Sequence, residues 1–291
     1  MKKTLTFIIN PISGGISKKE LPSLINQYLD KKQFDVEIQF TGSAQHNLEL
    51  AKEAVEKKTE IVVAVGGDGT INNVAKYLVN TGIAFGIIPQ GSGNGLARHL
   101  NIPMDITKAL QVINKLNTQN IDTGMANDVF FLNVAGAGFD AHVSMKFATA
   151  AERGFWSYTK ITLNEFAKYK SRKYELLVDG KSIVKDAFII CVANGSQYGN
   201  NAYIAPQAKI DDGLFEISIL KPFKLIQMPM IGLEMFTKKF GNSGYIDTLS
   251  CREVMIKREE AEVFNIDGEP VMMAKDILVR INPASLKMII P

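Results

Sequence analysis

Runs of apolar residues separated by amphipathic stretches organise the first part of the chain, up to about residue 125. Continuous apolar runs such as 5–9 and 61–65 predict strands that are buried on both faces. Between such runs, apolar residues recur at helical spacing, as at Leu21, Leu24 and Tyr28. The expected strands are 5–9, 34–40, 61–65 and 83–88, and the expected helices are 18–30, 48–57 and a segment ending at 77. Strands and helices that alternate in this order form a parallel sheet with right-handed crossovers.

The pattern changes after Ala126, where strands follow one another without regular helices between them. We expect these strands at 129–134, 174–178, 183–192, 214–220, 277–281 and 286–290, with longer helices only near 156–169 and 225–239. The predicted fold class is therefore α/β: an N-terminal parallel-sheet domain over 1–126, followed by a mainly antiparallel, β-rich second domain over 127–291. The last strand can return to the first domain.

Composition and charge exclude several classes of protein. The 291 residues carry a net charge of +3, too weak for a nucleic-acid-binding surface, so no nucleic-acid partner is expected. Cys191 and Cys251 make neither a disulfide framework nor a metal-ligand spacing, as is usual in a reducing cytoplasm. The N-terminal apolar run stops at Asn10, too short for a signal peptide, and no window has the ~18 apolar residues of a membrane span. These features predict a soluble, cytoplasmic protein.

Three glycine-rich loops, each following a predicted strand, carry the strongest chemical signal. They are Asn-Pro-Ile-Ser-Gly-Gly at 10–15, Gly-Gly-Asp-Gly-Thr at 66–70 and Pro-Gln-Gly-Ser-Gly-Asn-Gly at 89–95. Glycines let backbone N–H groups turn toward an anion, and a following helix N-terminus adds the positive end of its dipole. One such loop is equally well explained as a tight turn. Three at the carboxyl edge of one parallel sheet favour phosphate binding.

Polar side chains in these loops suit such a site. The hydroxyls of Ser13, Thr70 and Ser92 can hydrogen-bond phosphate oxygens. Asp68 can hold magnesium on the phosphates or orient an acceptor hydroxyl. Its alternative role is to cap the helix that begins near Thr70, since Asp is a favoured N-cap. Neither the Walker A pattern nor the dinucleotide-binding fingerprint is present, so a nucleotide would be held in another way.

Two motifs in the second half complete a resemblance to a known family. They are Ala205-Pro206-x-Ala208-x-x-Asp211-Asp212-Gly213-Leu214 and Asp267-Gly268-Glu269. Together with the three loops, they resemble the diacylglycerol kinase and sphingosine kinase family, of the soluble bacterial lipid kinase type, over essentially the whole chain. The resemblance implies an ATP- and Mg²⁺-dependent lipid kinase, with diacylglycerol as the expected acceptor. The first domain would then be the nucleotide-binding, catalytic domain, and the second would receive the lipid.

The same resemblance implies which residues bind ATP. They are Asn10, Pro11, Ile12, Ser13, Gly14, Thr41, Gly66, Gly67, Asp68, Gly69, Thr70, Ile71, Asn72, Ser92, Gly93 and Asn94. Thr41 also fits by its position at the end of the second predicted strand. Gly95 departs from the family, because diacylglycerol kinases usually have Asp there. The motif Gly-Ser-Gly-Asn favours sphingoid-base kinases.

Roles in the second domain are implied in the same way. A structural Mg²⁺ is expected on Asp212 and the backbone carbonyls of Lys209 and Leu214. Glu269, with Asp267 beside it, is the expected acceptor of the proton from the lipid hydroxyl, and Asp68 is the third candidate for a catalytic role. Asp-Gly in both motifs is by itself a strong hairpin-turn signal, and this alternative stays open.

Two stretches of the second domain can contact lipid. Aromatic residues at 154–158 precede several basic residues, and 223–240 is rich in Met, Leu and Ile and ends in Lys238-Lys239. Both patterns are also typical of core helices. We expect a transient, peripheral contact with the inner face of the membrane, and association into a homodimer stays open.

Three other functions fit parts of the sequence. A sphingoid-base or other lipid-alcohol kinase would explain Gly95. An NAD kinase would share Gly-Gly-Asp-Gly-Thr, but Asn-Pro-x-Ser-Gly and the Asp-Asp-Gly segment argue against it. A non-catalytic nucleotide-dependent regulator would bind ATP without turnover, which the presence of Asp68 and Glu269 disfavours.

Overall fold

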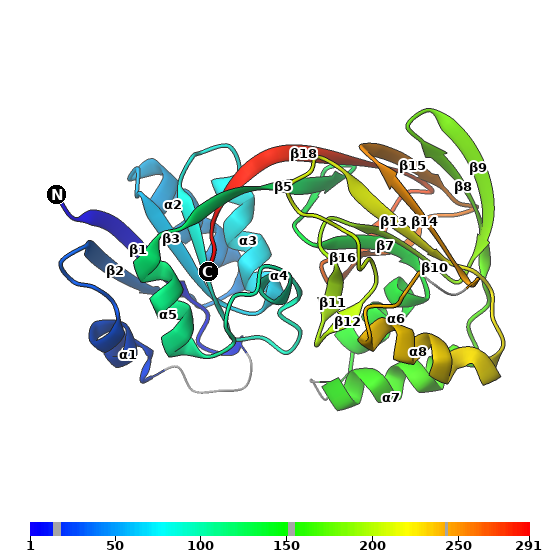
Figure 1. The fold of residues 1–291 in the computed structure, drawn as a ribbon, viewed down its shortest axis with the longest axis horizontal. Coiled ribbons are helices and arrows are strands. Elements are labelled where there is room, and N and C mark those ends of the chain that lie inside the picture. The colour runs from blue at the N-terminus through cyan, green and yellow to red at the C-terminus, as the bar shows by residue number, and fades with distance from the viewer. Residues whose placement is uncertain (14–18, 151–154, 242–243) are drawn as a thin grey trace. The chain divides into compact units, whose positions relative to one another are not determined.

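The computed structural model describes the chain except for residues 14–18, 151–154 and 242–243. It forms two compact units, one of Met1–Ile121 with Ala284–Pro291 and one of Asp122–Pro283. The chain leaves the first unit within β5 (Thr118–Ala126) and re-enters it within β18 (Asp276–Ile289), as the colours of Figure 1 show.

The first unit is built on a parallel sheet in the order β2-β1-β3-β4-β18. Its strands are β1 (Lys3–Ile9), β2 (Phe34–Phe40), β3 (Ile61–Gly66), β4 (Ala84–Pro89) and the end of β18. Its helices are α1 (Leu21–Tyr28), α2 (Ala44–Glu56), α3 (Asp68–Leu78), α4 (Gly95–His99) and α5 (Ile106–Lys115). Every residue of β3 and β4 is buried, as a central strand between two helix layers requires. Residue 18, the expected start of the first helix, lies outside the described residues.

The second unit contains an antiparallel six-stranded sheet in the order β14-β13-β10-β7-β16-β17. These strands are β7 (Val134–Gly138), β10 (Ile189–Ala193), β13 (Phe215–Leu220), β14 (Ile246–Cys251), β16 (Glu262–Ile266) and β17 (Glu269–Met273). A second antiparallel group comprises β8 (Arg172–Val178), β9 (Lys181–Ala187), β15 (Glu253–Lys257) and the start of β18. The remaining elements are β6 (Val129–Phe131), α6 (Phe139–Ala148), α7 (Phe155–Phe166), β11 (Gln197–Gly199), β12 (Ala202–Tyr203), η2 (Leu225–Gln227) and α8 (Met228–Phe236). These features confirm the predicted α/β fold class with a β-rich second part.

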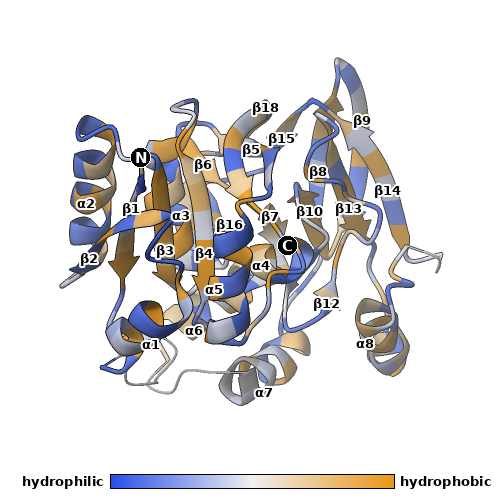
Figure 2. Cartoon of the chain, turned by 60° about the vertical axis from the view of Figure 1, so that its left-hand side comes forward, coloured by the Kyte–Doolittle hydropathy of each residue, from blue (hydrophilic) through white to orange (hydrophobic). Residues whose placement is uncertain are grey.

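The six-stranded sheet buries both of its faces. Ile190 and Val192 of β10 join a core with residues of β8, β15 and β18. Ile189 and Cys191, which alternate with them, join a second core with Phe166 of α7 and other helical residues. The helices α6, α7 and α8 therefore cover the outer face of this sheet, and the apolar strands at the centre of each unit stand out in Figure 2. No helix of the described residues is long and apolar enough to cross a bilayer.

Four expected strands were wrong in their limits. The run 183–192 is divided at Phe188 into β9 and β10, which belong to different sheets. The expected strand 129–134 is divided between β6 and the start of β7. By contrast, 277–281 and 286–290 are one strand, β18, which continues through Pro283 and through Ala284 at a φ of 49°. A single irregular position lets a strand pass proline without ending.

Candidate active site

The three glycine-rich loops lie at one edge of the first unit's sheet. Because β1, β3 and β4 are parallel neighbours, their carboxyl ends meet there. The backbone N–H of Asn10 donates to the Val65 carbonyl at 3.0 Å, and that of Gln90 donates to the Gly66 carbonyl at 2.7 Å. The loops therefore start in register with one another.

Side chains join the first loop to the second. Asn10 Nδ2 donates to Thr70 Oγ1 at 3.0 Å, and Asn10 Oδ1 accepts from the Ile12 N–H at 3.1 Å. Ser13 Oγ donates to the Asn10 carbonyl at 3.2 Å. Asn10 thus sets the shape of the first loop and holds that loop close to α3. Gly14, a predicted ATP-binding residue, lies outside the described residues.

The second and third loops touch backbone to backbone at Gly67 and Gly91. A Cβ on Gly91 would lie 2.5 Å from the Cα of Gly67, and a Cβ on Gly67 would lie 3.1 Å from the Cα of Gly91. The first distance is shorter than any real contact between carbon atoms, so a side chain at residue 91 would force the loops apart. These two glycines are required by the approach of one loop to the other.

Asp68 connects the same two loops. Its Oδ2 accepts from the Asn94 N–H at 2.8 Å and its Oδ1 from the Gly95 N–H at 2.9 Å. Asn94 is left-handed, with a φ of 52°, and its side chain bonds both the N–H and the carbonyl of Gly91. The alternative role of Asp68, as the cap of the helix near Thr70, was wrong. That helix, α3, begins at Asp68 after Gly67, and the Asp68 carboxylate bonds the first N–H groups of α4 instead.

The other predicted ATP-binding residues differ in how far a ligand can reach them. Ile12 is 84% exposed and Ser92 is exposed, whereas Thr41 is buried, with its N–H bonded to the Ile9 carbonyl. Ile71 is on the buried side of α3, so only its backbone can take part in binding. Pro11 is exposed, Gly66 is buried, and Gly67, Gly69, Asn72 and Gly93 are half-buried. The exposed loop ends and the N-terminus of α3 fit a phosphate chain.

In the second unit, Asp267 and Gly268 form the tight turn between β16 and β17. Ile266 pairs with Glu269, and the φ angles of Asp267 and Gly268 are both positive, at 49° and 90°. Two positive φ values are the signature of a type I′ hairpin turn. The turn alternative is therefore confirmed, and it determines how the two acidic side chains are presented.

Asp267 and Glu269 have different surroundings. The Asp267 carboxylate accepts from the backbone N–H groups of Leu132, Asn133 and Val134, at 2.7, 2.8 and 2.9 Å. The Glu269 side chain is exposed at the first position of β17 and makes no hydrogen bond or ion pair with the described residues. Asp267 thus fixes the hairpin to the β6–β7 connection, while the Glu269 carboxylate is available to a ligand.

The segment 209–214 leads into β13. Asp212 is exposed and its Oδ1 accepts from the Leu214 N–H at 3.1 Å, while the Gly213 N–H donates to Asp122 Oδ2 at 2.7 Å. The hairpin alternative was wrong here, because β13 pairs with β10 and β14 and not with the preceding strand β12. In the part of the chain that the structure describes, no cluster of three His, Cys, Asp or Glu side chains could hold a metal. A cation would therefore depend on Asp212 and backbone carbonyls.

The second unit also buries three acidic residues that the sequence did not single out: Asp122, Glu216 and Asp140. Asp122 is 1% exposed and supports the turn. Glu216 has a buried Oε1 without a hydrogen-bond partner in the described residues, and burial, together with nearby Asp212, raises its pKa to about 7. A buried carboxylate oxygen that senses the charge of Asp212 suits a hard cation. Asp140 is buried at the start of α6. Burial alone distinguishes these residues, and sequence pattern does not reveal it.

Glycine-rich loops on a parallel sheet, joined in one chain to a β-rich unit that presents an exposed carboxylate, fit a nucleotide-dependent phosphotransferase. Models of two families match: the diacylglycerol kinase catalytic domain over residues 4–126, and the YegS C-terminal NAD kinase beta sandwich-like domain over 133–290. A probable lipid kinase YegS-like from Pectobacterium atrosepticum is 30% identical over 98% of this chain and 95% of its own length. The chain therefore belongs to the family of lipid kinases that join these two domains, as its motifs indicated.

Further relatives agree with this assignment. The diacylglycerol kinase of Bacillus subtilis is 28% identical over 92% of this chain and 90% of its own length. The crystal structure of a diacylglycerol kinase from Bacillus anthracis has the same fold, with a TM-score of 0.77 at 21% identity over 99% of this chain and 97% of that one. The protein is a lipid kinase, and kinases of this family use ATP.

Proposed function

We propose that this lipid kinase transfers the γ-phosphoryl group of ATP to the hydroxyl of diacylglycerol, at the membrane surface and in the presence of Mg²⁺. The observation that carries the proposal is the set of contacts joining the three glycine-rich loops, from Asn10–Thr70 to Asp68–Asn94. The match of residues 4–126 to the diacylglycerol kinase catalytic domain supports the choice of lipid.

The first unit would bind the nucleotide through its loops. Backbone N–H groups of Ser92 and Gly93 and the N-terminus of α3 would hold the phosphates, because backbone donors and the helix dipole stabilise negative charge. Asn10 and Asp68 would act as positioning residues, since their polar atoms hold the loops together. Mg²⁺, when bound with ATP, supplies positive charge against the phosphate oxygens.

The second unit would contribute the proton acceptor. Glu269 has a free, exposed carboxylate, and it would accept the proton of the lipid hydroxyl or orient that hydroxyl. Asp267 would hold the hairpin in place through its bonds to residues 132–134. Asp212, with the carbonyls of Lys209 and Leu214, would hold a structural Mg²⁺ that stabilises the entry to β13.

The test is transfer of radiolabelled phosphate from ATP to lipids in mixed micelles. The acceptors are diacylglycerol, monoacylglycerol, a sphingoid base and ceramide, with NAD as an outgroup. Glu269→Gln should lower kcat by about 100-fold or more while leaving the Kd for ATP unchanged. Glu259→Gln, an exposed carboxylate without an ion pair in the described residues, is the matched control and should keep full activity.

Each result has a clear meaning. Label in diacylglycerol, lost in Glu269→Gln only, supports the proposal. Label in the sphingoid base instead would favour the alternative that Gly95 suggested. Label in NAD alone would overturn the choice of lipid as acceptor. Full activity of Glu269→Gln would overturn the role of this residue.

A further inference from the structure

The segment made by η2 and α8 exposes large apolar side chains to solvent. Five of them lie on its outer side and form what we call the docking face: Leu225 (62% exposed), Ile226 (85%), Met230 (43%), Leu233 (64%) and Phe236 (50%). Their spacing of three or four residues from Ile226 onward places them along one side of a helix. Contiguous apolar surface of this kind marks an interaction site.

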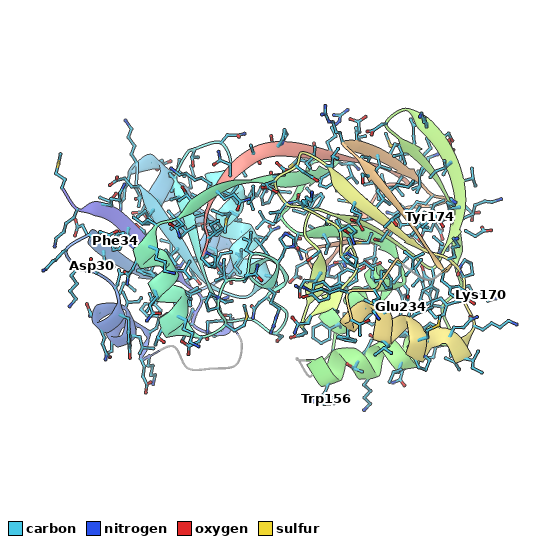
Figure 3. All side chains as sticks on the ribbon, in the orientation of Figure 1. Asp30, Phe34, Trp156, Lys170, Tyr174 and Glu234 are labelled. Atoms are coloured by element: carbon cyan, nitrogen blue, oxygen red, sulfur yellow. The ribbon has the colours of Figure 1, made fainter. Side chains whose placement is uncertain are left out.

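The inner side of the same segment packs Ile231, Met228 and Met235 on the core, and two polar residues face the protein beside them. Gln227 Oε1 accepts from the Lys224 N–H at 2.7 Å, and its Nε2 donates to the Tyr245 hydroxyl. Glu234, labelled in Figure 3, has a buried Oε2. Ile231 is the one fully buried residue of α8. A helix selected only for packing would bury its leucines and expose its glutamate. Packing within the fold therefore does not account for the exposed leucines.

Positive charge borders the docking face at both ends. Lys224 precedes Leu225, and Lys238 and Lys239 follow shortly after Phe236. Glu234 is the one acidic residue between 222 and 241 in the sequence, and it is turned inward. Apolar side chains bordered by lysines are the combination that binds the interface of an anionic bilayer.

The neighbouring helix α7 extends this surface. Both α7 and α8 pack on the same core, through Phe166 and Ile231. On α7, Leu163 is 56% exposed, and Trp156, labelled in Figure 3 at the start of the helix, is 81% exposed. Tryptophan is favoured at membrane–water interfaces because its ring is apolar and its N–H is polar.

We propose that the docking face of η2 and α8 binds the interfacial region of an anionic phospholipid bilayer, with α7 beside it. This inference rests on the proposed function, because a lipid kinase must reach a substrate that resides in a membrane. A second copy of the chain is a poorer occupant. In a two-fold dimer through this helix, parallel or antiparallel, lysines of one copy would face lysines of the other.

The test is flotation of the full chain with vesicles of phosphatidylcholine alone and of phosphatidylcholine with phosphatidylglycerol. The double variant Ile226→Glu with Leu233→Glu should lower partition into the anionic vesicles by roughly tenfold or more, since each leucine-sized side chain gains about that factor by burial. Lys238→Glu with Lys239→Glu should abolish the preference for anionic vesicles. Val184→Glu, which replaces an apolar residue 57% exposed on β9, is the control and should bind as the wild type does.

Kinase activity separates this inference from the proposed function. The docking-face double variant should lose phosphorylation of long-chain diacylglycerol in vesicles but keep that of a short-chain diacylglycerol dissolved as monomers. If the wild type phosphorylates neither lipid, the proposed function fails. Flotation still shows in that case whether the docking face binds anionic vesicles. Unchanged partition of the double variant would overturn the inference. The inference would also be overturned if the wild type forms a dimer in sedimentation, and the double variant loses that dimer but still binds the vesicles.

Discussion

Asp140 is an ionisable side chain enclosed in the second unit. It is 5% exposed, and its Oδ2 accepts from the Tyr198 hydroxyl and from Asn265 Nδ2, both at 3.2 Å. Its Oδ1 has no partner in the described residues. Burial, only partly offset by these hydrogen bonds, raises the pKa of Asp140 to about 6 from its ordinary value of 3.8. Folding therefore favours the protonated carboxyl.

This raised pKa predicts a pH dependence of stability. Because the unfolded chain loses the Asp140 proton at lower pH than the folded chain does, the free energy of unfolding should fall as pH rises from about 4 to about 6 and level off above. The full contribution is about 3 kcal/mol. Urea unfolding of Asp140→Asn should show a smaller fall than the wild type over this range. Asp186→Asn, at an exposed position, is the control, and parallel profiles for Asp140→Asn and the wild type would contradict the prediction.

Asp267 and Glu269 should differ in what their loss affects. Asp267→Ala leaves three backbone N–H groups without an acceptor and should lower the free energy of unfolding by about 2–4 kcal/mol. Glu269→Gln should leave stability unchanged and affect activity alone. Thermal unfolding measures both, with Asp128→Ala as a control at an exposed turn. Equal melting temperatures for Asp267→Ala and wild type would contradict the structural role of Asp267.

For single residues, the sequence predicted which side chains are candidates for the site better than it predicted which groups they contact. It singled out Asp68, Asp267 and Glu269 from motif and position. The alternative that it offered for Asp68, a cap on the helix near Thr70, named the wrong helix, because the N–H groups that Asp68 bonds lie 26 and 27 residues further along the chain. Such partners are decided by the packing of one loop on another.

Among the elements, the contact between the second and third loops gives a direct test. Gly91→Ala should separate these loops, lower the melting temperature and weaken ATP binding measured by calorimetry at least tenfold, because the new Cβ overlaps Gly67. Gly232→Ala places the same methyl group in open space on α8 and should be neutral or slightly stabilising. Normal ATP affinity in a folded Gly91→Ala protein would argue against a binding role for this pair of loops.

The elements themselves were predictable where one pattern was strong. Apolar runs located β1, β3 and β4 to within a few residues. The run 183–192 reads as one strand because both faces of β10 are buried and β9 is partly apolar, so no polar residue separates the two. The short α4 was missed because its start depends on Asp68 from another loop.

For the molecule as a whole, the return of the C-terminus should matter to the first unit. Residues 284–291 add the last strand beside β4, pairing Met288 with Phe85, and they bury Leu286, Met288 and Ile289. Deleting them should remove roughly 5 kcal/mol or more from the stability of the first unit, at 1.5–3 kcal/mol per large side chain. Limited proteolysis should then degrade 1–121 before 122–283. Deletion of the exposed Pro291 alone is the control. If the protein without 284–291 resisted the protease as well as the wild type does, the prediction would be contradicted.

The sequence alone determined the class of fold and the family, since periodicity, glycine loops and motif order are written along the chain. Tertiary structure alone decided three other features: the two glycines in backbone contact, the buried acids Asp122, Asp140 and Glu216, and the outward apolar side of α8. The physical reason is that burial and close approach belong to groups distant in sequence. A leucine or an aspartate has the same local pattern inside the protein or on its surface, and only its neighbours distinguish the two.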